Sequence, residues 1–138
     1  MNNGPLSMVY SEAVNADSFT STSVTLIGAS SGSNADSNVN VTLTGGGTAS
    51  ANGTAVVFNL SVAVLNSIKQ VEGLASSLGN TFLSATSSTI TDMTNNVLAV
   101  ISASAPLAAS AFYSDRCAAS LTWYQLDMNA GTLLMNFS

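Results

Sequence analysis

Apolar and polar residues alternate in the first part of the chain, which is the pattern of β-strands. Residues 22–27 are rich in β-branched types, and residues 38–44 place an apolar residue at every second position. A period of two is typical of a half-buried strand. A run of three glycines follows at 45–47, as in a surface loop. The sequence therefore predicts two strands joined by loops within residues 1–54.

The apolar spacing changes to a helical period in the second part of the chain. Residues three or four apart form one stripe made of Val64, Ile68, Val71, Ala75, Leu78 and Phe82. A second stripe includes Ile90, Met93, Val97, Val100 and Ile101. Pro106 should end it, because proline lacks the backbone donor and clashes with the preceding turn. A third helix follows, with Gly131 as its stop signal. The pattern therefore predicts long amphipathic helices over about 55–104 and 107–128.

These elements predict a mainly α fold with a short N-terminal β segment, and an α+β arrangement is the alternative. A length of 138 residues suits one domain with a core. We therefore expect a single self-assembling domain over residues 1–138. Its strand and loop segment spans 1–54, and its helical segment spans 55–138. The apolar tail at 132–138 is either a last core strand or a segment that docks on a neighbouring subunit.

Charged residues are few. The chain has two cations and seven carboxylates, so 7% of its residues are charged, whereas 46% are hydrophobic and the mean hydropathy is +0.38. An ordinary soluble domain has about a quarter of its residues charged. Charge keeps a monomer dispersed because neighbouring molecules repel one another. The composition therefore predicts a surface that contacts copies of the same chain.

The same composition excludes several classes of function. Two cations cannot neutralise the phosphates of a nucleic acid or the headgroups of an anionic membrane. We predict no membrane span, since no long uninterrupted apolar run is present. The chain has no histidine and no motif with a known mechanism, so we expect no enzyme and no catalytic, metal or cofactor-binding residues. Cys117 is either a small buried hydrophobe or half of an interchain disulfide.

Two sets of candidate site residues remain. The candidate ion-pairing and pH-sensing residues are Lys69, Glu72, Asp92, Asp115, Arg116 and Asp127. Their expected pairs are Lys69 with Glu72 or Asp127, and Arg116 with Asp92 or Asp115, with solvated surface charges as the alternative. The candidate subunit contacts are large apolar side chains near the C-terminus: Phe112, Tyr113, Trp123, Tyr124, Leu133, Leu134 and Phe137.

Three short segments resemble a known family. Ala13-Val14-Asn15, residues 22–30 and Phe112-Tyr113-Ser114-Asp115 are similar to stretches of the bacterial R-body structural proteins, the "killing trait" family. The resemblance implies small subunits that polymerise into a coiled ribbon, which unrolls on acidification. It also implies an inclusion in the bacterial cytoplasm, which the absence of a recognisable secretory signal favours.

Together these observations predict a structural subunit whose partner is itself. It would form a homopolymeric ribbon, filament or sheet, and its excess of carboxylates would make the assembly responsive to pH. The alternative is an extracellular pilus, surface-layer or virus coat subunit, which would place the protein outside the cell or on a virion surface.

Overall fold

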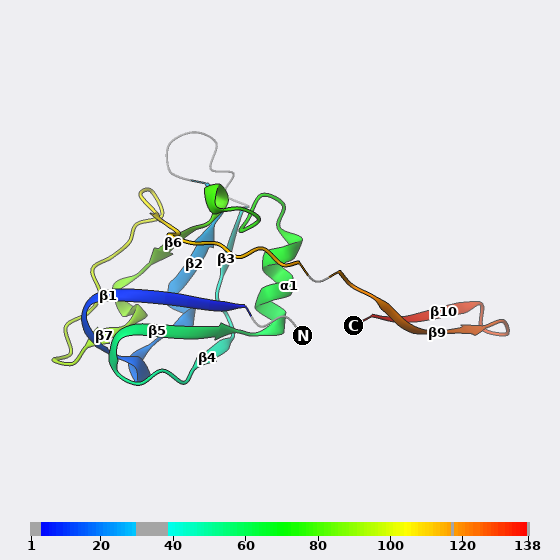
Figure 1. Cartoon of the computed structure of the whole chain (residues 1–138), viewed down its shortest axis with the longest axis horizontal. Helices are drawn as coiled ribbons and strands as arrows, with labels where there is room; N and C mark the ends of the chain where they lie inside the picture. Colours follow the sequence, from blue (N-terminus) through cyan, green and yellow to red (C-terminus); the bar gives the residue numbers. More distant parts are fainter. Residues whose placement is uncertain (1–3, 30–38, 117, 138) are drawn as a thin grey trace.

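The protein consists of a β-rich body and a projecting C-terminal hairpin (Figure 1). A computed structural model describes residues 4–29, 39–116 and 118–137. Its strands form three antiparallel sheets, ordered β4-β5-β1-β7, β3-β2-β6-β8 and β10-β9. Strands make up 42% of the described residues and helices 17%, so the predicted mainly α fold is wrong.

The first sheet is built on two long paired strands. Its strands are β1 (Pro5–Asn15), β4 (Gly46–Thr48), β5 (Gly53–Leu60) and β7 (Thr91–Asp92). Leu6 lies opposite Phe58 and Met8 lies opposite Val56, with these side chains turned inward, whereas Val9 is 82% exposed on the other face. The inward positions of both strands are apolar, but the outward positions include Val9 and Val57, so the alternation along the sequence is incomplete.

The second sheet contains both strands that the N-terminal pattern predicts. Its strands are β2 (Val24–Ile27), β3 (Asn40–Thr42), β6 (Phe82–Ala85) and β8 (Leu107–Ala108). The hydroxyls of Thr25 and Thr42 lie 2.9 Å apart across β2 and β3. In the described ranges, four short 3-10 helices connect the strands of the body: η1 (Ala16–Ser18), η2 (Ser21–Ser23), η3 (Leu78–Asn80) and η4 (Ser87–Thr89).

Helix α1 (Val62–Gln70) is the part of the predicted 55–104 helix that forms. The Ser61 hydroxyl caps it by accepting a hydrogen bond from the Val64 N–H at 3.3 Å. The first stripe residues Val64 and Ile68 are buried, as the helical spacing requires. The helix ends at Gln70, three residues before Gly73, whose φ of +80° is left-handed and suits glycine.

The remainder of the predicted 55–104 helix is not helical for two reasons. Before α1, the β-branched and aromatic residues of β5 satisfy their backbone in a sheet. After α1, Ser, Thr and Asn side chains bond to nearby backbone and compete with a helix, as Asn80 does with Ser76 and Ser77.

The predicted 107–128 helix is also wrong. This region contains β8, a connection over residues 109–120 that lacks regular structure where it is described, and β9 (Leu121–Asp127), which pairs with β10 (Thr132–Phe137). Alanine favours helices, but a short helix gains most of its stability from packing its apolar face. The alanines of 109–120 are mostly exposed, so no packing offsets the free-energy cost of forming the first helical turn there.

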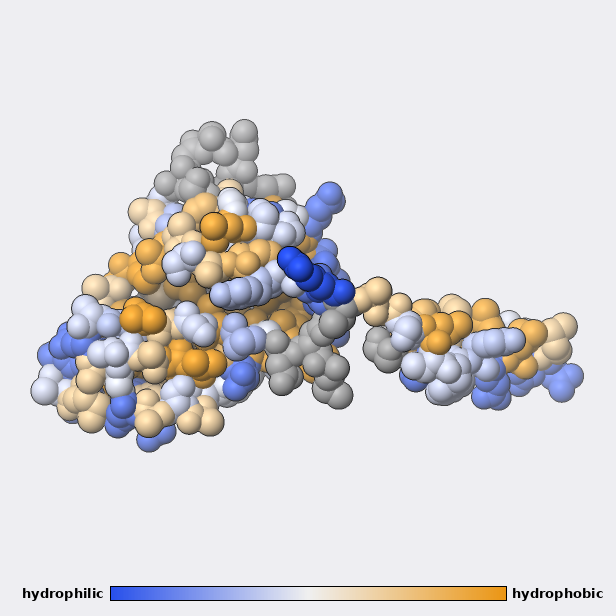
Figure 2. Space-filling view, in the orientation of Figure 1, coloured by the Kyte–Doolittle hydropathy of each residue, from blue (hydrophilic) through white to orange (hydrophobic). Residues whose placement is uncertain are grey.

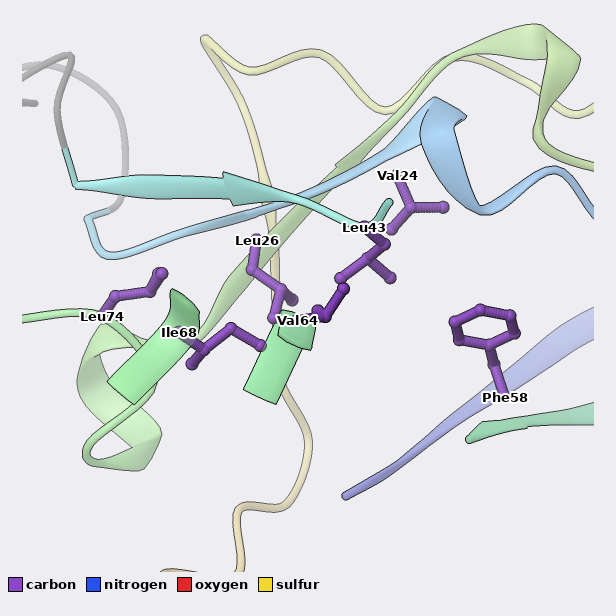
Figure 3. Close-up of a cluster of buried hydrophobic side chains, with 7 residues drawn as sticks. All are labelled: Val24, Leu26, Leu43, Phe58, Val64, Ile68 and Leu74. Atoms are coloured by element: carbon purple, nitrogen blue, oxygen red, sulfur yellow. The ribbon is translucent and has the colours of Figure 1, made fainter. Parts of the chain in front are cut away.

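The core lies between the two body sheets and α1. Figure 3 shows one cluster of buried side chains, made of Val24, Leu26, Leu43, Phe58, Val64, Ile68 and Leu74. A second buried cluster contains Val14, Ala16, Val56 and Ile90. Phe19 packs against both clusters, and its ring centroid lies 4.9 Å from that of Phe58. The hairpin contributes no residue to either cluster, so the body is built without it.

Candidate functional site

The C-terminal hairpin exposes many large apolar side chains. It follows residues 109–120, which leave the body after two polar contacts. The Ala109 N–H donates to the Thr81 carbonyl at 2.9 Å, and the Lys69 Nζ lies 2.7 Å from the Asp115 Oδ2. Lys69 therefore pairs with Asp115, where the sequence suggested Glu72 or Asp127. Both side chains are partly exposed, so this pair contributes at most about 1 kcal/mol.

The turn between β9 and β10 is fixed by its own residues. The Asp127 carboxylate accepts hydrogen bonds from the N–H groups of Asn129 and Ala130 at 2.9 and 3.0 Å. Gly131 then has a φ of +64°, a left-handed conformation typical of glycine at the end of such a loop. At the other end, the Thr122 hydroxyl donates to the Asn136 carbonyl and accepts from its side-chain amide. Local chemistry thus defines the hairpin.

One face of the hairpin is apolar. Leu126 lies directly opposite Leu133, and Tyr124 lies directly opposite Met135. Because side chains alternate along a strand, these two pairs project from the same face. All four side chains are between 50% and 67% exposed. The opposite face is mixed, since it pairs Trp123 with Asn136, Gln125 with Leu134 and Asp127 with Thr132.

This apolar face has no cover within the described part of the chain. Every residue of β9 and β10 is exposed. We call this hairpin, residues 121–137, the arm. Figure 2 shows hydrophobic residues along one side of the arm and hydrophilic residues along the other. A two-stranded hairpin is marginally stable in water at best. Large exposed apolar patches mark contact sites. The arm is therefore the first candidate site.

The predicted subunit contacts divide between the arm and the connection. Tyr124 and Leu133 lie on the apolar face, Trp123 and Leu134 lie on the mixed face, and Phe137 ends β10 opposite Leu121. On the connection, Phe112 is half-buried and Tyr113 is 92% exposed. The predicted Cys117 alternatives lie outside the described residues.

Two contact residues, Leu126 and Met135, were missed by the sequence analysis. The sequence places Leu126 in the predicted 107–128 helix and Met135 in the apolar tail, and neither is among the predicted subunit contacts. The strand-forming run at 121–126, followed by Asp127 and then by Gly131, is the signal that could have found them. The apolar tail is a strand, but it lies outside the core.

A second candidate site is a free edge of β1. In an antiparallel pair, residues alternate between facing the partner strand and facing away. The Leu60 N–H donates to the Gly4 carbonyl at 3.2 Å, so every second residue from Gly4 onward faces β5. The backbone groups of Pro5, Ser7 and Val9 therefore point away from β5.

No strand covers that edge within the described ranges. On the side away from β5, the neighbour of β1 is β7, which pairs only with Val14 and Asn15. Ser7 is exposed and Val9 is 82% exposed. An uncovered edge is a template for pairing with another strand. The β1 edge can thus accept a strand by main-chain hydrogen bonding.

A hollow of about 240 Å³ lies where the free edge ends. Its lining includes Tyr10, Ser11 and Glu12 on one side and Val97, Leu98 and Ala99 on the other. Burial raises the pKa of the Tyr10 phenol, which therefore stays neutral over the physiological range. Polar and apolar side chains both line the hollow.

Asp92 organises the turn beside this hollow. Its carboxylate accepts hydrogen bonds from the backbone N–H groups of Thr94 and Asn96 at 2.7 and 2.8 Å, and from both side chains. The hydrogen bond from the Asn96 side chain is the largest of the effects that lower the pKa of Asp92. These hydrogen bonds hold residues 92–96 in a turn, so the second predicted helical stripe does not form a helix there.

Acidification is expected to weaken the turn that Asp92 organises. Because hydrogen bonds lower the folded pKa of Asp92, its stabilisation is fully present above about pH 4 and is lost as the pH falls through the folded value. At pH 7 the Asp92→Asn chain should unfold at a lower urea concentration than the wild-type chain. The difference between the two unfolding midpoints should shrink as the pH falls below about 4. Equal pH dependence in both chains would contradict this role.

The remaining predicted charges do not gather into a site. Glu72 and Arg116 are exposed, and no three cysteine, aspartate or glutamate side chains in the described ranges could hold a metal ion. Among the described helices, none is long and apolar enough to cross a membrane. No family model, curated protein or solved structure matches the chain. The arm and the β1 edge are therefore the two candidate functional surfaces.

Proposed function

We propose that the protein is a structural subunit that assembles with copies of itself through its C-terminal arm. The observation that carries the proposal is the apolar face of the β9–β10 hairpin, which lies outside the body and is exposed along its whole length. A folded arm without a core is stable only when something covers it. A neighbouring copy can provide that cover, because it is present wherever the protein is.

The charge distribution supports a neighbour of the same kind. The arm carries one charged side chain, Asp127, and it lies at the turn. The whole chain has only nine charged residues. Two copies can therefore approach without strong repulsion and without burying unpaired charges, which would be costly.

The free energy gained by burying the apolar face is similar to the free-energy cost of bringing two chains together. Burying a large apolar side chain contributes roughly 1.5–3 kcal/mol, so four such side chains contribute about 6–12 kcal/mol. Association of two proteins costs about 4–15 kcal/mol in lost freedom. A stable assembly therefore needs the apolar face together with further contacts, such as backbone pairing.

The arrangement favours an open assembly. The arm is at one end of the molecule, whereas the candidate acceptor surfaces lie on the body (Figure 1). When a subunit donates one surface and accepts at another, the contact is head-to-tail and repeats from copy to copy. Such contacts give a filament, ribbon or sheet unless the rotation closes a ring.

Replacing Leu126 and Leu133 with serine is expected to weaken self-association by about 100-fold or more. The two leucines contribute roughly 3–6 kcal/mol when buried, and 1.4 kcal/mol corresponds to tenfold in affinity. Sedimentation velocity of the full chain over a range of concentrations measures the effect. The wild-type chain should form large species as the concentration rises, and the variant should sediment as a monomer.

The matched control is Gln125→Ser with Thr132→Ser, which changes the same two strands on the mixed face. This control should assemble within a few-fold of the wild-type chain. All three chains should unfold at the same urea concentration when measured as monomers, since the hairpin supplies no core residue. A wild-type chain that remains a monodisperse monomer at the highest concentrations would overturn the proposed function.

A further inference from the structure

We infer that the free edge of β1 is the acceptor site for the arm, and that β10 of a second copy pairs with it as an added strand. The inference rests on the proposed function and names the surface that the arm occupies. The pairing would extend the β4-β5-β1 sheet of one subunit by the two strands of the next.

Backbone geometry is the first argument. Ser7 and Val9 direct their N–H and C=O groups away from β5, as the register of β1 shows, and no described strand receives them. In a two-stranded sheet, the outer edge of β10 is likewise without a described neighbour. The free segment from Pro5 to Val9 and the six residues of β10 are similar in length. Adding a strand to such an edge is a common mode of recognition.

Side-chain patterning agrees with the pairing. Along β1, Leu6 and Met8 are half-buried on the inner face of the sheet. Along β10, Leu133 and Met135 project from the apolar face of the arm. In the register that sets Leu134 directly opposite Ser7 or Val9, the apolar face of the arm continues the inner face of the sheet. Leu134 then lies on the outer face with Val9, which is 82% exposed in the single chain.

Charge selects β10 over β9. Asp127 ends β9, whereas β10 has no charged residue. Pairing through β9 would place a carboxylate at the interface. Burying such a charge without a partner is costly. The uncharged strand is therefore the one that fits.

The occupant is a second copy because of where the arm lies. Figure 1 shows the hairpin projecting away from the body, and the ion pair of Lys69 with Asp115 ties the connection to α1. Each chain thus presents one donor strand and one acceptor edge, and the arm of one copy meets the edge of the next.

Val9→Pro tests the acceptor edge directly. The Val9 N–H points away from β5, so proline removes a donor needed by the incoming strand and leaves the β1–β5 ladder intact. Pro5 already occupies an equivalent outward position of β1. We expect self-association to fall by about 10- to 100-fold, because the lost hydrogen bond leaves its partner unsatisfied. Val9→Thr keeps the N–H and should assemble within a few-fold of wild type.

Mixing two deficient chains separates this inference from the proposed function. The Val9→Pro chain keeps its arm, and the Leu126→Ser, Leu133→Ser chain keeps its edge. At a concentration where each chain alone is a monomer, an equimolar mixture should give a 1:1 heterodimer in sedimentation velocity. Ser7→Pro serves as a second acceptor variant if Val9→Pro changes the circular dichroism of the body.

The outcomes are distinguishable. If the proline variants retain the body fold and assemble like wild type while the arm variant does not, the acceptor assignment is overturned and the proposed function stands. If the wild-type chain is a monomer whose Ser7 and Val9 amides are protected from hydrogen exchange, its own arm covers the edge, and both proposals fail. If the wild-type chain is a monomer with unprotected amides and binds only a different protein, both also fail.

Discussion

Replacing Phe58 with alanine is expected to lower the free energy of unfolding by about 3–5 kcal/mol, the usual cost of removing a buried phenylalanine. Phe58 is 2% exposed, and its ring lies 4.9 Å from that of Phe19. Phe19 packs against both buried clusters, so a cavity at Phe58 loosens the place where they meet. A domain is stable by only about 5–15 kcal/mol, and the loss is therefore a large fraction of the total.

Urea unfolding in the Leu126→Ser, Leu133→Ser background measures this effect, because assembly of the wild-type chain would add its own stabilisation. The matched control is Val57→Ala on the same strand. Val57 is 40% exposed on the outer face, so its truncation should cost under about 1 kcal/mol. Equal losses for the two variants would show that Phe58 is not a core residue.

Gly46→Ala is expected to destabilise the body by about 2–6 kcal/mol. The φ of Gly46 is +138°, which side-chain-bearing residues rarely adopt, and such strain costs about 1–3 kcal/mol. A Cβ there would also lie 2.7 Å from the Phe58 Cζ and would contact the Asn59 carbonyl. Overpacking of this kind costs about another 1–3 kcal/mol.

The neighbouring Gly47→Ala is the control, since a Cβ at Gly47 meets nothing within 4 Å and its φ is outside the left-handed region. This variant should unfold within about 1 kcal/mol of the parent when both are followed by circular dichroism in urea. A tolerated Gly46→Ala would mean that β4 does not approach β5 as closely as described.

The assembly proposals connect these stability variants to function. The body folds around Phe58 and α1, and the arm adds nothing to that core. Core variants should therefore change the unfolding midpoint, whereas arm and edge variants should change only self-association. The two groups of measurements test the separation of a folded body from an assembly arm.

Part of the helical pattern was interpreted correctly and part was not. The spacing of Val64 and Ile68 predicts the buried face of α1, and both residues are buried. The prediction that this helix continues to Phe82 is wrong, because the left-handed Gly73 and the hydrogen bonds of the Asn80 side chain prevent it. An apolar period of three to four within a serine-rich and asparagine-rich chain does not exclude turns, since those side chains can satisfy the backbone locally.

The sequence predicted several residues of the candidate site but not their arrangement in space. The sequence pointed to Tyr124 and Leu133 as subunit contacts, and both lie on the apolar face of the arm. It placed the first in a helix, so their shared face and the partners Leu126 and Met135 were missed. The free edge of β1 was missed as well, because residues 1–20 have too little contrast between apolar and polar positions to predict a strand of eleven residues.

The amino-acid sequence by itself determined the scarcity of charge, the absence of histidine chemistry, strands β2 and β3, and the buried face of α1. These features depend on residue type or on short-range periodicity. Only the tertiary structure decided that the alanine-rich region is an extended connection and that the tail pairs outside the core. It also decided which of two adjacent glycines is irreplaceable. Such features depend on which surfaces find a packing partner, and contacts between residues far apart in the chain decide that.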